Sequence, residues 1–180
     1  MGGPERTALD LSVDDFLAGL SSEVRPEHGL VCVSYPNERT GGITTETWQA
    51  GRRPPSECLY YRPSTIIPRN LRDHKHRARA TDFGWTFCIT LDDVNTKIDA
   101  RIIKLSPTYI IETSPGNYQW GYKLVEPVPI AQANAVVKAM VTQGLTDKGR
   151  SNLAGQMMRV PGSLNKKCAP FHARVHKWAL

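Results

Sequence analysis

The chain has 180 residues, 40% of them hydrophobic and 22% charged, which is typical of one globular domain and excludes a disordered chain. No apolar run approaches the roughly 20 residues that a membrane-spanning helix needs, and the N-terminus lacks the basic-then-apolar pattern of a signal peptide, so we expect a cytoplasmic protein without a membrane partner. The net charge of +6 permits a polyanionic partner without requiring one.

The first third of the chain predicts a helix followed by two short strands. Ser12 precedes two acidic residues and an apolar stripe at helical spacing, so we expect a capped amphipathic helix, because a serine side chain can accept from the amide three residues on. Residues 29–35 and 58–62 are rich in strand formers and are closed by proline. The Gly-, Thr-, Arg- and Pro-containing residues 37–55 between them predict one long irregular connection.

A basic segment follows the second strand, and we expect it to be helical. Its side chains suit the phosphate backbone of a single-stranded template, while a solvated basic face is the alternative. The candidate template-binding residues are Arg69, Arg72, Lys75, Arg77 and Arg79.

The most apolar segment, residues 83–91, ends at two adjacent carboxylates. Nearly every position is apolar, which predicts an internal strand buried on both faces. Asp92 and Asp93 follow it directly. Because successive strand residues point to opposite faces, both side chains can meet one site only if the chain turns there.

A hairpin with a polar turn comes next. Residues 108–113 and 118–124 are rich in strand formers, and Pro115-Gly116 between them predicts a tight turn. The loop presents a hydroxyl, exposed amides beside a glycine, and Gln119 at the start of the second strand. These groups suit phosphates, and the alternative is an ordinary hairpin with nothing bound.

The last third predicts two helices and a final element. Apolar residues from Ile130 to Val141 recur at helical spacing and stop at Gly144, so we expect a helix packed on the sheet. A second helix is predicted over 149–158, just after Asp147. Val160-Pro161-Gly162 predicts a turn, and residues 171–178 fit either a strand or a helix.

The three carboxylates form a candidate metal site. Two adjacent carboxylates at the end of a buried strand are costly unless a cation neutralises them. Asp92 and Asp93, with Asp147 as the third ligand, would provide the oxygen donors that Mg²⁺ or Mn²⁺ prefers. The alternative is that the pair ends a strand and that Asp147 caps a helix.

These segments together resemble the RepB-type primases of plasmids and phages, within the archaeo-eukaryotic primase (primase-polymerase, AEP) superfamily. Three matches occur in order and cover roughly residues 83–167: the strand ending in Asp92-Asp93-Val94, the loop from Ser114 to Gln119, and the stretch from Asp147 to Lys166 that contains Arg159-Val160-Pro161-Gly162. The resemblance implies an α/β (α+β) primase fold with a mostly antiparallel, RRM-like sheet flanked by helices, and a single catalytic domain over residues 1–180.

The resemblance also implies roles for individual residues. Asp92, Asp93 and Asp147 match the acidic motifs that hold catalytic metals. Ser114 and Gln119 match the motif that binds the phosphates of the incoming nucleotide, with glutamine where many members have histidine. Further nucleotide or template contacts are expected from Asn117, Arg159, Asn165 and Lys166.

Such a site would perform phosphoryl transfer. Two metal ions would bridge the attacking 3′-hydroxyl and the leaving pyrophosphate, and Lys97 would help to neutralise the triphosphate. Trp85, Tyr118 and Trp120 are candidate base platforms, with a role in the core as the alternative. The expected partners are single-stranded DNA, nucleoside triphosphates and a replicative helicase in cis or trans, because no phosphate-binding GxxxxGK[ST] loop occurs here. We expect a phage- or plasmid-encoded protein in a bacterial host, and a fragment of a larger replication protein.

Three competing interpretations remain. His74 and His76 with Tyr60 and Tyr61 resemble the His-x-His site and nucleophilic tyrosine of rolling-circle nucleases. A non-catalytic nucleic-acid-binding module of similar topology would use the acids only to cap turns. Four-residue spacing would align three further residues on one helical face as a zinc site, namely Cys168, His172 and His176. The four cysteines, Cys32, Cys58, Cys88 and Cys168, are widely spaced, and Cys32 and Cys88 lie in apolar runs, so we expect buried free thiols.

Overall fold

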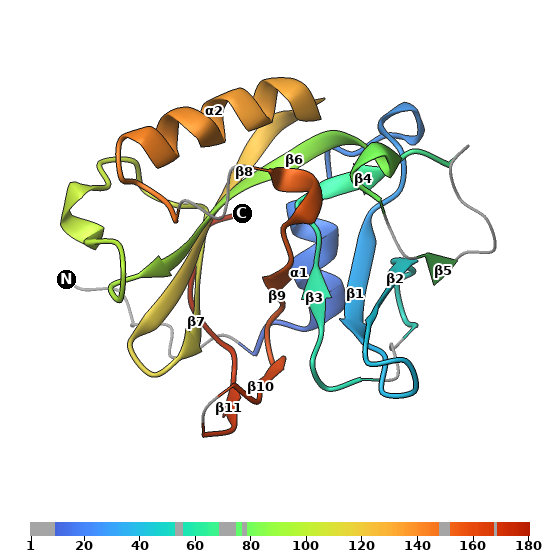
Figure 1. Cartoon of the computed structure of the whole chain (residues 1–180), viewed down its shortest axis with the longest axis horizontal. Helices are drawn as coiled ribbons and strands as arrows, with labels where there is room; N and C mark the ends of the chain where they lie inside the picture. The colour runs from blue at the N-terminus through green and yellow to red at the C-terminus, as the bar shows by residue number, and fades with distance from the viewer. Residues whose placement is uncertain (1–9, 53–55, 69–74, 77–78, 148–151, 168) are drawn as a thin grey trace.

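The computed structural model describes residues 10–52, 56–68, 75–76, 79–147, 152–167 and 169–180. The described strands form two five-stranded sheets and a short ribbon of β10 (Leu164–Asn165) with β11 (Phe171–His172). Every pairing between named strands is antiparallel. With two α-helices beside the sheets, the predicted α+β class with mainly antiparallel sheets is confirmed (Figure 1).

Helix α1 (Val13–Leu20) begins as predicted. The Ser12 hydroxyl accepts a hydrogen bond from the Asp15 amide at 3.0 Å, which satisfies one of the free N–H groups of the first turn. The buried face of the helix consists of Phe16, Leu17 and Leu20. This face joins a core that is shared by both large sheets, with Val33, Tyr61, Phe87, Tyr109 and Ile111 among its members.

The first large sheet has the order β5-β2-β1-β3-β9. Its strands are β5 (Lys75–His76), β2 (Ile43–Thr47), β1 (Cys32–Pro36), β3 (Tyr60–Tyr61) and β9 (Met158–Arg159). The presence of β2 shows that the expectation of an irregular connection over 37–55 was wrong. The sequence signal was hidden because β2 buries hydroxyls in place of apolar groups: Thr45 is buried and hydrogen-bonds Ser34 across the strand pair at 2.9 Å.

The second large sheet has the order β12-β7-β8-β6-β4. Its strands are β12 (Arg174–Trp178), β7 (Tyr109–Ser114), β8 (Asn117–Pro129), β6 (Phe83–Val94) and β4 (Ser64–Ile66). Strand β6 is internal and buried on both faces, as predicted: Cys88 belongs to the core beneath α1, and the next residue, Ile89, packs on the opposite side. Burial raises the pKa of the Cys32 and Cys88 thiols to about 12, and both are free.

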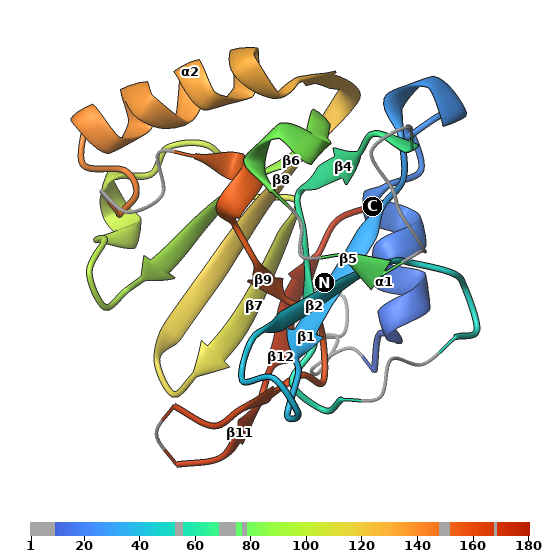
Figure 2. The same cartoon turned by 45° about the vertical axis from the view of Figure 1, so that its right-hand side comes forward.

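Helix α2 (Ile130–Thr142) covers the outer side of β6 and β8, away from α1 (Figure 2). Its buried residues are Ala133 and Val137, which pack against Ile89. Gly144 follows with a φ of +73°, a conformation that favours glycine, and the chain turns away. The predicted helix and its end are therefore confirmed.

The second predicted helix, over 149–158, is wrong for the residues that the structure describes. Residues Leu153–Gly155 form a single 3-10 turn, η6, and β9 follows it. Tertiary contacts override the local preference here. The Leu153 amide donates to the Asn134 side chain at 2.9 Å, and β9 completes the first large sheet by pairing with β3.

The remaining elements are short. Residues 171–178 are extended, in β11 and β12, so the strand alternative is the correct one. The 3-10 turns η1 (Pro26–His28), η3 (Ala80–Asp82) and η4 (Ala100–Ile102) lie in connections. The helix predicted over 69–79 falls largely outside the described residues, which include β5 within it. Neither described α-helix has the length and apolar character needed to cross a bilayer.

Candidate active site

A bulge at the end of β6 carries the two adjacent carboxylates. Leu91 lies opposite Trp120 and Val94 lies opposite Tyr118, so β6 advances three residues while β8 advances two. The extra residue interrupts the alternation that would send Asp92 and Asp93 to opposite faces. Asp93 has a φ of +59°, which L-residues adopt rarely and which redirects the chain at this point. The chain therefore changes direction at the carboxylate pair, which is the condition for both to serve one site.

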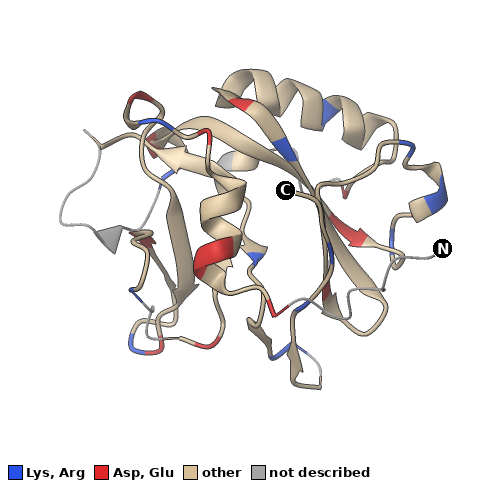
Figure 3. Cartoon of the chain, turned by 180° about the vertical axis from the view of Figure 1, so that it is seen from behind, with Lys and Arg blue, Asp and Glu red and all other residues tan. Residues whose placement is uncertain are grey.

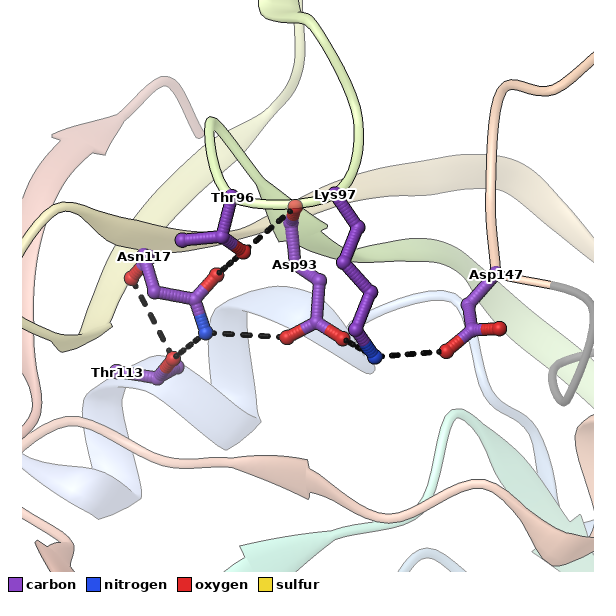
Figure 4. Close-up of polar contacts among 6 residues, drawn as sticks. All are labelled: Asp93, Thr96, Lys97, Thr113, Asn117 and Asp147. Carbon is purple, nitrogen blue, oxygen red and sulfur yellow. Dashed lines mark hydrogen bonds and ion pairs between the residues drawn. The ribbon is translucent and has the colours of Figure 1, made fainter. Parts of the chain in front are cut away.

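The turn after the bulge presents Lys97. The Asp93 carbonyl accepts the amides of Thr96, Lys97 and Ile98 at 3.2, 2.9 and 3.2 Å, and Ile98 is buried. The Lys97 ammonium lies 2.7 Å from Asp93 Oδ2 and 3.1 Å from Asp147 Oδ2 (Figure 4). Hydrogen bonds from Lys97 to Asp93 and then to Asp147 raise the pKa of the ammonium above its ordinary value. Two carboxylates far apart in the sequence thus face one cation.

Asn117 connects the β7–β8 turn to this carboxylate cluster. Its Nδ2 donates to Asp93 Oδ1 at 3.1 Å and to Thr113 Oγ1 at 3.4 Å, and its Oδ1 accepts from Thr96 Oγ1 at 2.8 Å (Figure 4). The hairpin is as predicted, with Gly116 at a φ of +73°. Neither Thr96 nor Thr113 was a candidate from sequence, because isolated threonines carry no motif.

Glu112 also holds the β7–β8 turn. Its Oε1 accepts from the Gly116 amide at 2.9 Å, and its Oε2 lies 3.1 Å from His176 Nε2. Burial tends to raise the pKa of Glu112, but the Gly116 amide and His176 together hold it below its ordinary value. The polar turn is therefore held at both ends by side chains of the sheet.

Gln119 lies inside the molecule and joins the two large sheets. It is 1% exposed, and its Nε2 donates to Tyr109 Oη at 3.0 Å and to the Arg159 carbonyl at 3.2 Å. Its Oε1 accepts from the Arg159 amide at 2.9 Å. The side chain thereby pairs with the backbone of β9 much as a strand would. Gln119 matches a motif position where many RepB-type primases have histidine. Both of its polar side-chain atoms form hydrogen bonds within the protein.

The Arg159 guanidinium organises the turn that follows it. It is 7% exposed and donates to the Leu164 carbonyl and to Asn165 Oδ1, each at 3.0 Å, while its centre lies 4.8 Å from the ring centroid of Tyr60. Asn165 in turn donates to the Thr113 carbonyl at 2.8 Å. These contacts link the Arg159-Val160-Pro161-Gly162 segment to the end of β7, next to the polar turn.

The remaining predicted binding residues lie at different places. Ser114 is half-buried at the end of β7, and Lys166 is exposed after β10. Arg79 is exposed, and Lys75 lies in β5, while Arg69, Arg72 and Arg77 fall outside the described residues. Figure 3 shows acidic and basic residues interspersed over the described ribbon.

The candidate base platforms are partly engaged already. Trp85 packs against His28 with ring centroids 4.8 Å apart, and Tyr118 meets His176 edge-on at 5.2 Å. Trp120 is half-buried in β8. Each ring is therefore only partly open to a base.

The structure describes some residues of each competing site, among them Tyr61, His172 and His176. Tyr61 is fully buried with its hydroxyl 2.5 Å from that of Tyr109, and burial raises the pKa of Tyr61 well above its ordinary value. His74 and Cys168 lie outside the described residues. His172 and His176 lie on β11 and β12, so the helical face proposed for zinc does not exist. Among the described residues, no three His, Cys, Asp or Glu side chains form a ready metal cluster.

A cavity of about 830 Å³ lies elsewhere, between the start of α1, Trp48, Arg52 and the turn at Pro161-Gly162. None of the three predicted metal-binding carboxylates lines it. Among the described residues that line this cavity, no ion pair joins two carboxylates to one cation. We therefore identify the candidate site by its chemistry and not by cavity size.

Comparisons with known proteins give two kinds of similarity. A family model described as the RepB DNA-primase N-terminal domain matches residues 49–176, well over half of the chain. The AEP domain of the primase-polymerase from cyanophage S-2L superposes with a TM-score of 0.62 at 12% identity, covering 91% of this chain and 89% of that one. The primase RepB′ gives a TM-score of 0.54 at 15% identity, covering 91% of this chain and 58% of that one. A search among curated proteins finds no match.

Proposed function

This chain belongs to the RepB DNA-primase N-terminal domain family, and from that premise we propose that it is a metal-dependent nucleotidyltransferase that starts or extends primers on single-stranded DNA. Membership of the family supports a DNA-primase function, and the shared AEP fold is consistent with it. The observation that carries the proposal is the convergence of Asp93 and Asp147 on one cation, next to Asn117 of the β7–β8 turn.

The donor set fits Mg²⁺ or Mn²⁺. Asp93 and Asp147 already place oxygens within 3.1 Å of one positive centre, and carboxylate oxygens are the ligands that these hard cations prefer. Asp92 precedes Asp93 in the chain and is half-buried, and we propose it as the third ligand. When bound, the metal ions would activate the 3′-hydroxyl and stabilise the leaving pyrophosphate. We assign the metal ligands to Asp92, Asp93 and Asp147.

The surrounding residues would position the reacting groups. Asn117 holds Asp93 by a hydrogen bond to Oδ1, and this leaves Oδ2 facing the cation. Ser114 and Lys166, neither of which is buried, would contact the triphosphate. Gln119, Arg159 and Asn165 would not contact the nucleotide. They would hold the β7–β8 turn and β9 in position. A fixed arrangement of this kind lowers the cost of aligning an in-line displacement.

We propose single-stranded DNA and nucleoside triphosphates as the binding partners. Single-stranded DNA would be held mainly through its phosphates by the basic segment that contains Arg79, and nucleoside triphosphates would enter from solvent. We further propose that residues 1–180 act as a single catalytic domain, with any helicase on another domain or chain.

A primer-synthesis assay tests the function. The protein is incubated with single-stranded DNA, NTPs or dNTPs, and Mg²⁺ or Mn²⁺, and a second reaction supplies a pre-formed primer so that extension is measured apart from initiation. We expect labelled oligonucleotide products that require metal and Asp93. Absence of products in every combination, with or without primer, would count against nucleotidyl transfer and favour a non-catalytic nucleic-acid-binding module.

The rolling-circle alternative is tested in the same preparation. Only that activity predicts a covalent protein–DNA adduct that Tyr60→Phe would remove. We expect no adduct, because Tyr60 lies beneath the Arg159 guanidinium and its neighbour Tyr61 is buried.

A further inference from the structure

The Lys97 ammonium contacts both of the carboxylates Asp93 and Asp147, which we propose as metal ligands. It makes ion pairs of 2.7 and 3.1 Å with Asp93 Oδ2 and Asp147 Oδ2. A divalent metal bound through those oxygens would lie about 2.0–2.2 Å from them. Because the two cations would share ligand atoms and repel each other, they cannot use these oxygens together. We infer that Lys97 is a resident counter-ion that competes with the metal and must leave the carboxylates for the metal to bind; this rests on the proposed function.

The side chain is free to leave while its backbone stays in place. The Lys97 amide is fixed to the Asp93 carbonyl at 2.9 Å, and the neighbouring Ile98 is buried. The Lys97 side chain, by contrast, is 61% exposed, and its four-carbon stem is flexible. Release of the ammonium therefore requires rotation of one exposed side chain and no unfolding of the turn.

The displaced ammonium needs a new partner, and a triphosphate is a suitable one. Lys97 lies on the same surface as Asn117 and the polar turn, to which Thr96 is directly bonded. A nucleotide that accepts the ammonium removes the competitor from the carboxylates. Metal and nucleotide should therefore bind with positive coupling, and most of this coupling should depend on the Lys97 charge.

Calorimetric titration of MnCl₂ into the intact chain, without nucleotide or DNA, measures the competition directly. We expect Lys97→Met, which keeps the stem and removes the charge, to bind Mn²⁺ about threefold to tenfold more tightly than the unaltered chain. Lys97→Arg keeps the charge and should bind with nearly unaltered affinity. Lys104→Met is the matched control, because it removes an exposed charge that donates to the backbone carbonyl of Arg101 at 3.2 Å and makes no ion pair with a carboxylate among the described residues.

Two further measurements keep the inference open to refutation. The rise in thermal unfolding temperature on adding Mn²⁺ should be larger for Lys97→Met and Lys97→Gln than for Lys104→Met. A non-hydrolysable nucleoside triphosphate should tighten Mn²⁺ binding to the unaltered chain more than to Lys97→Met. If Lys97→Met binds Mn²⁺ no more tightly than Lys104→Met, Lys97 does not compete, and the inference is overturned.

Carboxylate variants separate this failure from failure of the proposed metal site. Suppose that Asp93→Asn and Asp147→Asn lose Mn²⁺ binding while Lys97→Met binds Mn²⁺ with the affinity of the unaltered chain. The proposed metal site is then supported, and only the competing role of Lys97 is refuted. If both asparagine variants bind Mn²⁺ as the unaltered chain does, or if no variant binds it, the metal site and the inference fall together.

Discussion

Two polar clusters share strand β8, the first through Asn117 and the second through Gln119, and they differ mainly in exposure. In the carboxylate cluster, formed by Asp93, Lys97, Asn117 and Asp147, the side chains of the ion pairs are 22%, 61% and 36% exposed for Asp93, Lys97 and Asp147. In the Gln119 cluster, formed by Gln119, Tyr109, Arg159 and Asn165, no residue is more than 9% exposed. Exposed charges exchange partners at low cost, whereas buried polar groups need all their partners at once. The first cluster is therefore suited to chemistry and the second to holding the fold.

The largest predicted effect separates the clusters by activity. Asp93→Asn removes a charge but keeps a similar shape, and we expect primer synthesis to fall by at least about 100-fold, because loss of even outer-shell support for a metal costs 10- to 100-fold. The free energy of unfolding should change by less than about 1 kcal/mol, as is typical of exposed ion pairs. Primer assays and urea unfolding measure the two quantities. A strongly destabilised variant would contradict the division of roles.

The second prediction concerns stability. Gln119→Ala leaves the Arg159 amide and carbonyl without their partner, and it creates a cavity between the sheets, so we expect the free energy of unfolding to fall by about 2–4 kcal/mol. Gln132→Ala on the exposed face of α2 is the matched control and should be nearly neutral. Denaturant unfolding measures both variants. Equal stabilities would show that the Gln119 cluster does not hold the sheets together.

Gln119→Glu tests the buried cluster by adding a charge with almost no change of shape. The carboxylate keeps the acceptor for the Arg159 amide but cannot donate to the Arg159 carbonyl when ionised, so it would place a buried charge against an acceptor. We expect destabilisation at neutral pH that lessens as the pH falls and the carboxyl becomes protonated. Unfolding midpoints measured from pH 5 to 8 would test this. A midpoint independent of pH would mean that the group is not confined to the buried site.

A smaller effect is predicted for Asn117→Ala. This change removes the hydrogen bond that orients Asp93 without removing a charge, so we expect about a tenfold loss of primer synthesis and little change in stability. Steady-state assays at saturating Mn²⁺ provide the test. Full activity would show that the hairpin turn does not position the carboxylate.

The smallest effect is expected at Cys88. Burial holds the pKa of this thiol near 12, so almost no reactive thiolate is present at pH 8. We expect slow labelling by a thiol reagent that is unchanged in Asp93→Asn and faster in Gln119→Ala, because only the latter opens the core more often. Peptide mass spectrometry identifies the labelled cysteine. Faster labelling in Asp93→Asn would show that the carboxylate cluster also stabilises the buried core around Cys88.

Local sequence patterns predicted the elements whose stability is decided locally. The Ser12 cap, the apolar run of β6, the Pro115-Gly116 turn and the stop at Gly144 each act within a few residues, and each is confirmed. The helix predicted over 149–158 was wrong because β9 gains its partners from β3 and Gln119, which lie far away in the chain. Strand β2 was missed because its buried face consists largely of hydroxyls that are satisfied only across the sheet.

The family and the chemical groups of the candidate site could be predicted from the sequence, because the acidic, polar and basic motifs are short segments that occur in a fixed order. How these groups are used depends on the three-dimensional arrangement of the chain. This arrangement brought Asp147 to the Lys97 ammonium beside Asp93, and it buried Gln119 against β9 with 1% of its surface exposed. The physical reason is that burial and ion pairing depend on contacts between distant segments, and no local pattern specifies whether a polar side chain will meet solvent, a ligand or another strand.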